Sequence, residues 1–439
     1  MSGASTEQPY TSRRPAFSRV AHAAFRRLPG AAGPLGMRLK RLCPHPEEAR
    51  SAVSKGEVAP LAQARFQTML KRPCCSERTA PQSTAEASSL LRSLGVSVSL
   101  WFPSFTALLL AALLAVGGCA PTVTGLGESV AASVLADDHI VTADGMRLPL
   151  HAWRPEGPPV AVLVGLHGFN DYANGFDRAA TWWAERGILT YAYDQRGFGR
   201  TATRGLWPGA EALAGDLRTV VGLVRARHPG VPVYAIGVSM GGSVILAALG
   251  SGHPLPVDGA ILSAPGVTGE KGIGRLERAG LWLGAHTIPW ATVTGEGVRT
   301  HPSDNIEMLR GLNRDPVVMK KARLDAVYGM LLLADDAFAA APWASRPLLV
   351  LYGQREDIVR RGGRDALLSA LPRDGPWRLA EYPDGYHLLL RDLKAELVFA
   401  DVLAWLRDPA GALPSGAERP GRTLRPPAPG ARVRKAPAD

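Results

Sequence analysis

Short, almost continuously apolar segments alternate with longer amphipathic segments between about residues 136 and 408. Segments with helical periodicity lie between the apolar runs. The runs themselves are rich in β-branched and aromatic residues, which is typical of strands buried on both faces. The expected strands are 160–166, 188–193, 233–236, 260–263, 348–352 and 378–382, and the expected helices include 179–186, 210–227 and 243–249. This alternation predicts an α/β fold in which a mostly parallel central sheet carries helices on both faces.

Two segments depart from the alternation. Residues 141–153 predict an antiparallel hairpin at the edge of the sheet, turning near Asp144 and Gly145. Residues 266–340 carry helical patterns that contain Leu, Trp and Arg. Because this insertion follows a strand end, we expect it to form a helical cap over that edge of the sheet. The whole predicted domain, residues 136–410, is long enough to bury one large core.

Both ends of the chain have a different composition. Residues 1–92 are rich in Arg, Pro, Ala and Ser without a regular period, which predicts a basic disordered leader or a translation start further downstream. Residues 411–439 predict a disordered, basic, Pro-rich tail.

An apolar segment, residues 93–119, ends in Val-Gly-Gly-Cys at Cys119. The order of basic, apolar and small residues is that of an export signal, and the small residues before Cys119 resemble a bacterial lipobox. The resemblance implies lipidation at Cys119, with residues 120–135 as a tether. An uncleaved signal anchor is the alternative, since the run could span a membrane. Either reading predicts a bacterial envelope protein facing the periplasm, with the outer membrane favoured.

The charge of the chain is concentrated in its ends. The net charge is +11, yet the first 100 residues alone hold 15 Lys and Arg against six Asp and Glu. The central domain is therefore close to neutral, which argues against a nucleic-acid partner. All four cysteines lie within the first 119 residues. The domain thus has no thiol nucleophile or Cys-based zinc site, and no motif in it suggests a metal or a cofactor.

The segment Gly237-Val-Ser239-Met-Gly241 follows an expected strand and precedes an expected helix. This is the G-x-S-x-G pattern in its strand-turn-helix setting, in which a strained serine is lifted above the sheet. The flanking glycines are required because a Cβ would collide with the neighbouring strand and helix. We therefore predict Ser239 as a nucleophile.

A serine nucleophile needs a base and an orienting acid, and in doubly wound hydrolases the chain order is Ser, acid, His. His387 follows the last strand and is the only histidine after the acid region. The loop after residue 353 offers Glu356 and Asp357 as acids. Asp335 and Asp336 precede the strand and fall in the expected cap, so they are less suitable.

Two backbone N–H groups should form an oxyanion hole. Met240 follows the nucleophile and supplies one. Phe169, in the loop Leu166-His167-Gly168-Phe169 after an early strand, is the candidate for the other. We expect His167 to shape this loop and not to act as a base.

Together these motifs, with Asp194-Gln-Arg196-Gly-Phe-Gly-Arg-Thr201, resemble the α/β-hydrolases of the monoacylglycerol lipase, lysophospholipase and serine-aminopeptidase-like group. The resemblance spans about residues 138–408. It implies an α/β-hydrolase fold with Ser239 as nucleophile, His387 as base and then acid, and a cap over an apolar acyl pocket. The group reads Gly-x-x-Asp at the acid, and the register from Gly353 puts Glu356 there, with Asp357 next if the loop shifts.

The expected function is therefore metal-free hydrolysis of acyl esters of the monoacylglycerol or lysophospholipid type. An aliphatic, Trp-bearing cap sequence around Trp282 and Trp290 favours lipid-like substrates. A serine aminopeptidase-like peptidase is the alternative within the enzymes. A non-catalytic module on a hydrolase scaffold is the alternative outside them.

Overall fold

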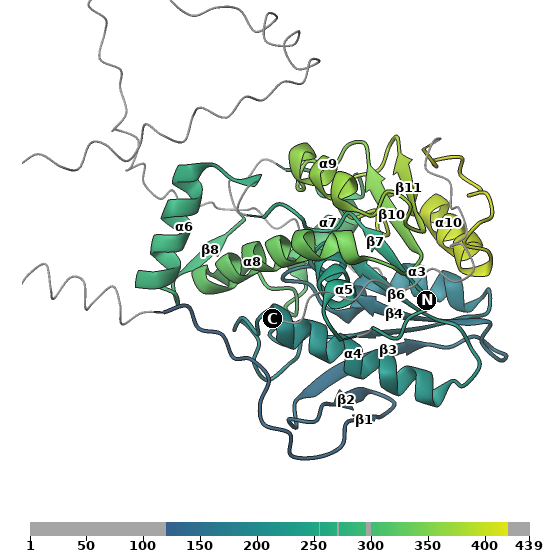
Figure 1. The fold of residues 1–439 in the computed structure, drawn as a ribbon, viewed down its shortest axis with the longest axis horizontal. Helices are drawn as coiled ribbons and strands as arrows, with labels where there is room; N and C mark the ends of the chain where they lie inside the picture. Colours follow the sequence, from purple (N-terminus) through teal and green to yellow (C-terminus); the bar gives the residue numbers. More distant parts are fainter. Residues whose placement is uncertain (1–119, 254, 270–271, 296–299, 420–439) are drawn as a thin grey trace, which may run out of the picture. The chain divides into compact units, whose positions relative to one another are not determined.

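A large, mostly parallel sheet organises the computed structural model, which describes residues 120–253, 255–269, 272–295 and 300–419 (Figure 1). Within these ranges nine strands follow the order β1-β2-β3-β5-β4-β6-β7-β10-β11. Pairing is antiparallel from β1 to β5 and parallel from β5 to β11. The strands are β1 Val134–Leu135, β2 His139–Val141, β3 Arg147–Trp153, β4 Ala161–Leu166, β5 Ile188–Tyr193, β6 Val233–Val238, β7 Gly259–Ser263, β10 Leu348–Gly353 and β11 Trp377–Tyr382.

Helices cover both faces of the sheet, as the sequence pattern predicts. The helices outside the insertion are α3 Asp177–Ala184, α4 Ala210–Arg227, α5 Met240–Gly250, α9 Arg361–Ala370 and α10 Ala395–Arg407, with a 3-10 turn η3 at Ala173–Phe176. Side chains of β4 point alternately to opposite faces. Val162 and Val164 join the apolar cluster that contains α4 and α5, whereas Leu163 joins the cluster that contains α3 and α10. Both faces of the central strands are therefore buried.

An insertion lies between β7 and β10. Its elements are α6 Arg275–Thr287, β8 Thr292–Thr294, α7 Ile306–Arg314, β9 Lys321–Arg323, α8 Leu324–Ala340 and the turn η5 Ala341–Trp343. Helix α8 runs beside α5, and α6 with β8 lies at one end of the domain (Figure 1). The contact between α5 and α8 is close, because a Cβ added at Gly250 would lie 2.3 Å from the Cβ of Ala340.

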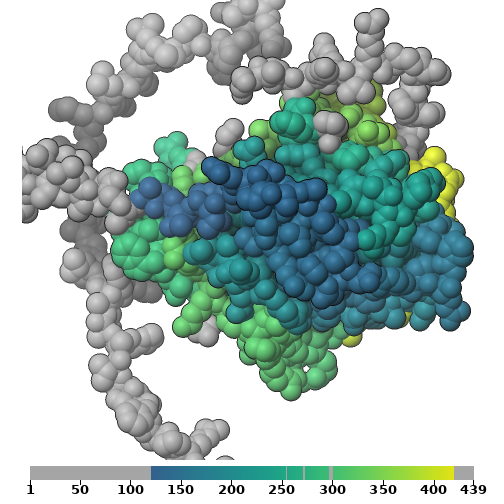
Figure 2. All heavy atoms as spheres, turned by 90° about the horizontal axis from the view of Figure 1, so that it is seen from below, coloured from purple at the N-terminus to yellow at the C-terminus, as the bar shows by residue number. Residues whose placement is uncertain are grey.

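The described residues at both ends of the domain pack against it. Val123 forms a bridge with Trp207, and the residues from 120 onward lie along the surface in the face shown in Figure 2. At the other end Glu418 forms an antiparallel bridge with Ala380 of β11 and pairs with the buried Arg378. The sequence predicts a tether over 120–135 and a disordered tail over 411–439. In the structure residues 120–135 and 411–419 instead pack on the domain, through contacts with residues far away in the sequence that a local pattern does not reveal.

Several sequence predictions fall outside the described residues. These are the leader at 1–92, the apolar segment 93–119 with Cys119, and the tail beyond 419. In the part of the chain that the structure describes, every helix is too short or too polar to cross a lipid bilayer. Lipidation at Cys119 stays a prediction.

A buried charge network fastens the β2–β3 turn to the loop after β5. The Arg196 guanidinium donates to Asp144 at 2.8 Å and to Asp216 of α4 at 2.9 Å. The side chains of these three residues are at most 6% exposed. Arg196 therefore braces the loop that follows β5 against α4 and the β2–β3 turn.

Arg196→Ala is expected to lower the free energy of unfolding by about 3–5 kcal/mol, because it leaves two buried carboxylates without their cation. Urea unfolding followed by circular dichroism measures the change. Arg225→Ala is a matched control, since the Arg225–Asp258 pair is 40% exposed on each side and should contribute less than about 1 kcal/mol. Equal losses in the two variants would contradict the bracing role.

Candidate active site

The loops that carry the expected site residues leave the same edge of the sheet. In the parallel register Leu166 of β4 lies opposite Gly237 of β6, and Gly353 of β10 lies opposite Tyr382 of β11. The carboxyl ends of these strands therefore share one edge, where ligands bind in sheets of this kind. The segments that follow contain Phe169, Ser239, Glu356 and His387.

Ser239 occupies a strained turn between β6 and α5. Its φ is 52° and its ψ is −115°, a backbone conformation that costs energy for a residue with a Cβ. Close packing explains the two glycines beside it. A Cβ at Gly237 would lie 2.3 Å from the Gly241 carbonyl carbon, and one at Gly241 would lie 2.2 Å from the Leu166 oxygen. The turn therefore has the strained backbone expected of a nucleophile raised above the sheet.

Glu356 and His387 meet across the loops that follow β10 and β11. The Nδ1 atom of His387 lies 2.7 Å from Oε2 of Glu356, and both side chains are at most 5% exposed. The other carboxylate oxygen, Oε1, accepts the N–H groups of Ile358 and Val359 at 2.7 and 2.9 Å. Burial raises the pKa of Glu356, but the hydrogen bonds from His387 and the backbone outweigh it, so the net shift is downward. A charged carboxylate thus orients the imidazole through its Nδ1 atom.

Asp357 makes a different contact. Its Oδ2 atom accepts the backbone N–H of His301, which belongs to the insertion, at 2.8 Å. The structure therefore brings Glu356, and not Asp357, to the histidine. Asp335 and Asp336 lie on α8.

The loop after β4 lies against the serine. A Cβ added at Gly168 would be 3.5 Å from the Cβ of Ser239, which places the neighbouring Phe169 backbone beside the nucleophile. Met240 begins α5, where helix N–H groups lack an intrahelical acceptor. These are the positions expected for two oxyanion donors.

His167 is fully engaged within this loop. Its Nδ1 lies 2.8 Å from the Gly168 oxygen, and its Nε2 accepts the N–H of Gln195 at 3.0 Å. Burial lowers the pKa of His167. Because neither nitrogen can accept a proton from Ser239, His167 shapes the loop and offers no second base.

The insertion touches every loop of the site. Met319 N–H donates to the Asn170 oxygen at 2.9 Å, and Leu388 N–H donates to the Pro302 oxygen at 2.8 Å. The N–H of Gly266, at the start of the insertion, donates to the Ser239 backbone oxygen at 3.0 Å, and the N–H of His301 donates to Asp357. Sequence reasoning missed the contacting residues of the insertion, since no motif marks them.

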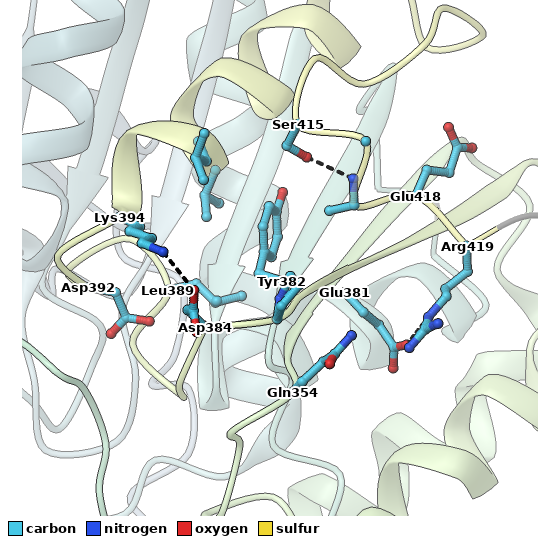
Figure 3. Close-up of a pocket in the computed structure, with 16 residues that line it drawn as sticks. Gln354, Glu381, Tyr382, Asp384, Leu389, Asp392, Lys394, Ser415, Glu418 and Arg419 are labelled. Atoms are coloured by element: carbon cyan, nitrogen blue, oxygen red, sulfur yellow. Dashed lines mark hydrogen bonds and ion pairs between the residues drawn. The ribbon is translucent and has the colours of Figure 1, made fainter.

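A cavity of about 430 Å³ lies elsewhere (Figure 3). It is bounded by the end of β11, the start of α10 and residues 415–419. Its lining residues do not include Ser239, His387 or Glu356. Within the described residues no cluster of three or more His, Cys, Asp or Glu could hold a metal ion.

Comparison with known proteins points to one family. Residues 157–394 match the family model described as serine aminopeptidase, S33. The monoacylglycerol lipase of Mycolicibacterium smegmatis is 27% identical over 267 residues, covering 60% of this chain and 93% of that protein. The mouse monoglyceride lipase is 25% identical over 286 residues, covering 63% of this chain and 92% of that protein.

Solved structures agree on the architecture. A soluble variant of the monoglyceride lipase from Saccharomyces cerevisiae, in complex with a substrate analogue, superposes with a TM-score of 0.52 at 19% identity, covering 64% of this chain and 96% of that one. The monoacylglycerol lipase of Paleococcus ferrophilus gives 0.51 at 17% identity, covering 59% and 98%. These similarities confirm the predicted α/β-hydrolase fold.

Proposed function

We infer that this chain, which belongs to the serine aminopeptidase S33 family, is a carboxylic ester hydrolase that works through Ser239, His387 and Glu356. The contact of 2.7 Å between His387 and Glu356 carries this proposal, because it fixes an imidazole at the edge of the sheet where Ser239 is raised. A serine hydroxyl becomes a nucleophile only beside such an oriented base.

The reaction proceeds in two halves. His387 Nε2 takes the Ser239 proton while Oγ attacks the ester carbonyl, and the N–H groups of Phe169 and Met240 stabilise the oxyanion. Glu356 stabilises the imidazolium without taking its proton. His387 then protonates the departing alcohol, which leaves an acyl-serine. Water, deprotonated by the same imidazole, then attacks the acyl carbonyl carbon. The imidazolium returns its proton to the departing Ser239 Oγ, which releases the carboxylic acid and restores the free serine.

Lipid-like esters are the substrates that the surroundings favour. The insertion carries exposed apolar side chains, among them Trp282, Leu283, Ile288 and Trp290. We propose that the insertion caps the site and accommodates an acyl chain of the monoacylglycerol or lysophospholipid type. The names of the two relatives, monoacylglycerol lipase and monoglyceride lipase, support this substrate class.

A labelling and substrate series tests the proposal on the full chain. A fluorophosphonate probe should form one adduct, located on Ser239 by peptide mass spectrometry. Esters of p-nitrophenol with long acyl chains should exceed the acetate ester in kcat/KM by at least about tenfold. The free energy of a tenfold ratio equals that gained by burying roughly two methylene groups. Monoacylglycerol should be hydrolysed in the same preparation.

Aminoacyl p-nitroanilides distinguish the peptidase alternative. A peptidase that releases N-terminal residues would need an acidic anchor for the substrate amine. Faster cleavage of these anilides than of long-chain esters would contradict the ester-hydrolase proposal. Absence of any Ser239 adduct would favour the non-catalytic module.

A further inference from the structure

A short part of the insertion lies against both loops that carry the acid and the histidine. We call residues 301–305 the strap. At its start the N–H of His301 donates to Asp357 beside the acid, and at its end Asn305 Nδ2 donates to the Arg391 oxygen at 3.0 Å. The strap therefore contacts both the loop that carries Glu356 and the loop that carries His387.

In the middle of the strap a serine meets a buried carboxylate. The Ser303 hydroxyl donates to Asp392 Oδ1 at 2.6 Å, and Asp392 Oδ2 accepts the backbone N–H of Tyr386 at 2.8 Å. Ser303 and Asp392 are each only 3% exposed. The carboxylate thus bridges the strap to the backbone N–H of Tyr386, the residue before His387.

The peptide group that follows the histidine is also held by the strap. The Pro302 oxygen accepts the N–H of Leu388 at 2.8 Å. Two adjacent strap residues, Pro302 and Ser303, therefore fix the backbone on either side of His387, one directly and the other through Asp392.

The burial of the Asp392 carboxylate lowers the stability of the fold. Within the described residues its carboxylate takes part in no ion pair, and the nearby Lys394 pairs with Asp384 instead (Figure 3). Burial raises the pKa of Asp392 to about 6, although the hydrogen bonds from Ser303 and Tyr386 act in the opposite direction. A buried carboxylate without a cation is unfavourable for stability, and such groups concentrate at functional sites.

We propose that Ser303 and Asp392 are positioning residues for His387, so that the insertion as well as Glu356 sets the orientation of the imidazole. This inference rests on the proposed function. Neither residue reaches the reacting atoms. Their effect is to hold the His387 backbone in place. Small misplacements of a catalytic group lower the rate and leave substrate affinity largely unchanged.

Three variants test the positioning pair in ester hydrolysis by the full chain. Asp392→Ala removes both hydrogen bonds and should lower kcat about 10–100-fold, with KM within about twofold. Ser303→Ala removes one and should lower kcat about 3–10-fold. Asp392→Asn keeps both, because its oxygen accepts from Tyr386 while its amide donates to Ser303, and should keep kcat within about threefold.

Ser369→Ala is the matched control. Its hydroxyl donates to the Asp365 oxygen on the exposed face of α9, so kcat should not change. Circular dichroism gives the folded fraction of each variant. If Asp392→Ala fails to fold, Ser303→Ala and Asp392→Asn still decide the question through their kcat and KM values.

Opposite outcomes separate this inference from the proposed function. An Asp392→Asn variant as slow as Asp392→Ala would overturn positioning by hydrogen bonds. A rise in KM at constant kcat in the alanine variants would also overturn it, and so would an unchanged kcat in both of them. In each of these cases wild-type protein still forms the fluorophosphonate adduct on Ser239. Wild-type protein that forms no adduct would overturn the proposed function and this inference together.

Discussion

Glu356→Gln should lower kcat for ester hydrolysis by about 10³–10⁴-fold. In the structure Oε1 of Glu356 accepts two backbone N–H groups and Oε2 faces His387 Nδ1. A carboxamide has one oxygen, and the two backbone donors will hold it. Its NH2 group then faces Nδ1 as a donor, which forces the imidazole into the tautomer with its proton on Nε2. That tautomer cannot accept the Ser239 proton.

Steady-state kinetics with a p-nitrophenyl ester measure this loss, with Asp357→Asn as the matched control. An asparagine at 357 can still accept the His301 N–H, so its kcat should stay within about threefold of wild type. A larger loss in Asp357→Asn than in Glu356→Gln would show that the loop shifts by one residue in solution and that Asp357 is the acid.

Ser239→Ala should lower kcat by about 10⁵–10⁶-fold, the largest effect expected for any single change. The variant loses the atom that forms the acyl intermediate, whereas the oxyanion donors and the binding surface remain. Residual turnover should therefore exceed the uncatalysed rate only slightly, and KM, where measurable, should change little.

The fold of this variant should be intact, because alanine has the same Cβ and the same unfavourable backbone geometry at φ 52° as serine. We expect a Tm within about 2 °C of wild type. Turnover comparable to wild type in a preparation free of other esterases would contradict acyl transfer through Ser239.

The sheet was predictable because each central strand is buried on both faces and so consists of an uninterrupted apolar run. The expected helix at 210–227 coincides with α4, and the expected hairpin over 141–153 corresponds to β2 and β3. The last helix, α10, and the packed ends were not identified. Their positions depend on pairing with distant residues, as Glu418 does with Arg378 across 40 positions.

Candidate site residues could be found where the chemistry has a local signature. A glycine on each side of Ser239 and a histidine after the last strand are such signatures, and the register from Gly353 favoured Glu356 over its neighbour. The Ser303–Asp392 pair has none. Its members are 89 positions apart, and a buried serine or aspartate in a loop looks ordinary in a single sequence. Only the folded arrangement shows that they meet beside the histidine.

Residues 417–419, which pair with β11, affect the self-association of this protein. By hydrogen bonding along β11, they cover a margin of the sheet whose free peptide groups could otherwise recruit a strand from another copy. The opposite margin is the two-residue β1, too short to be an effective template. Self-association of the described domain in concentrated solution should therefore proceed through the exposed apolar side chains of α6 and of the turn at Trp290. Mild detergent should reverse this association.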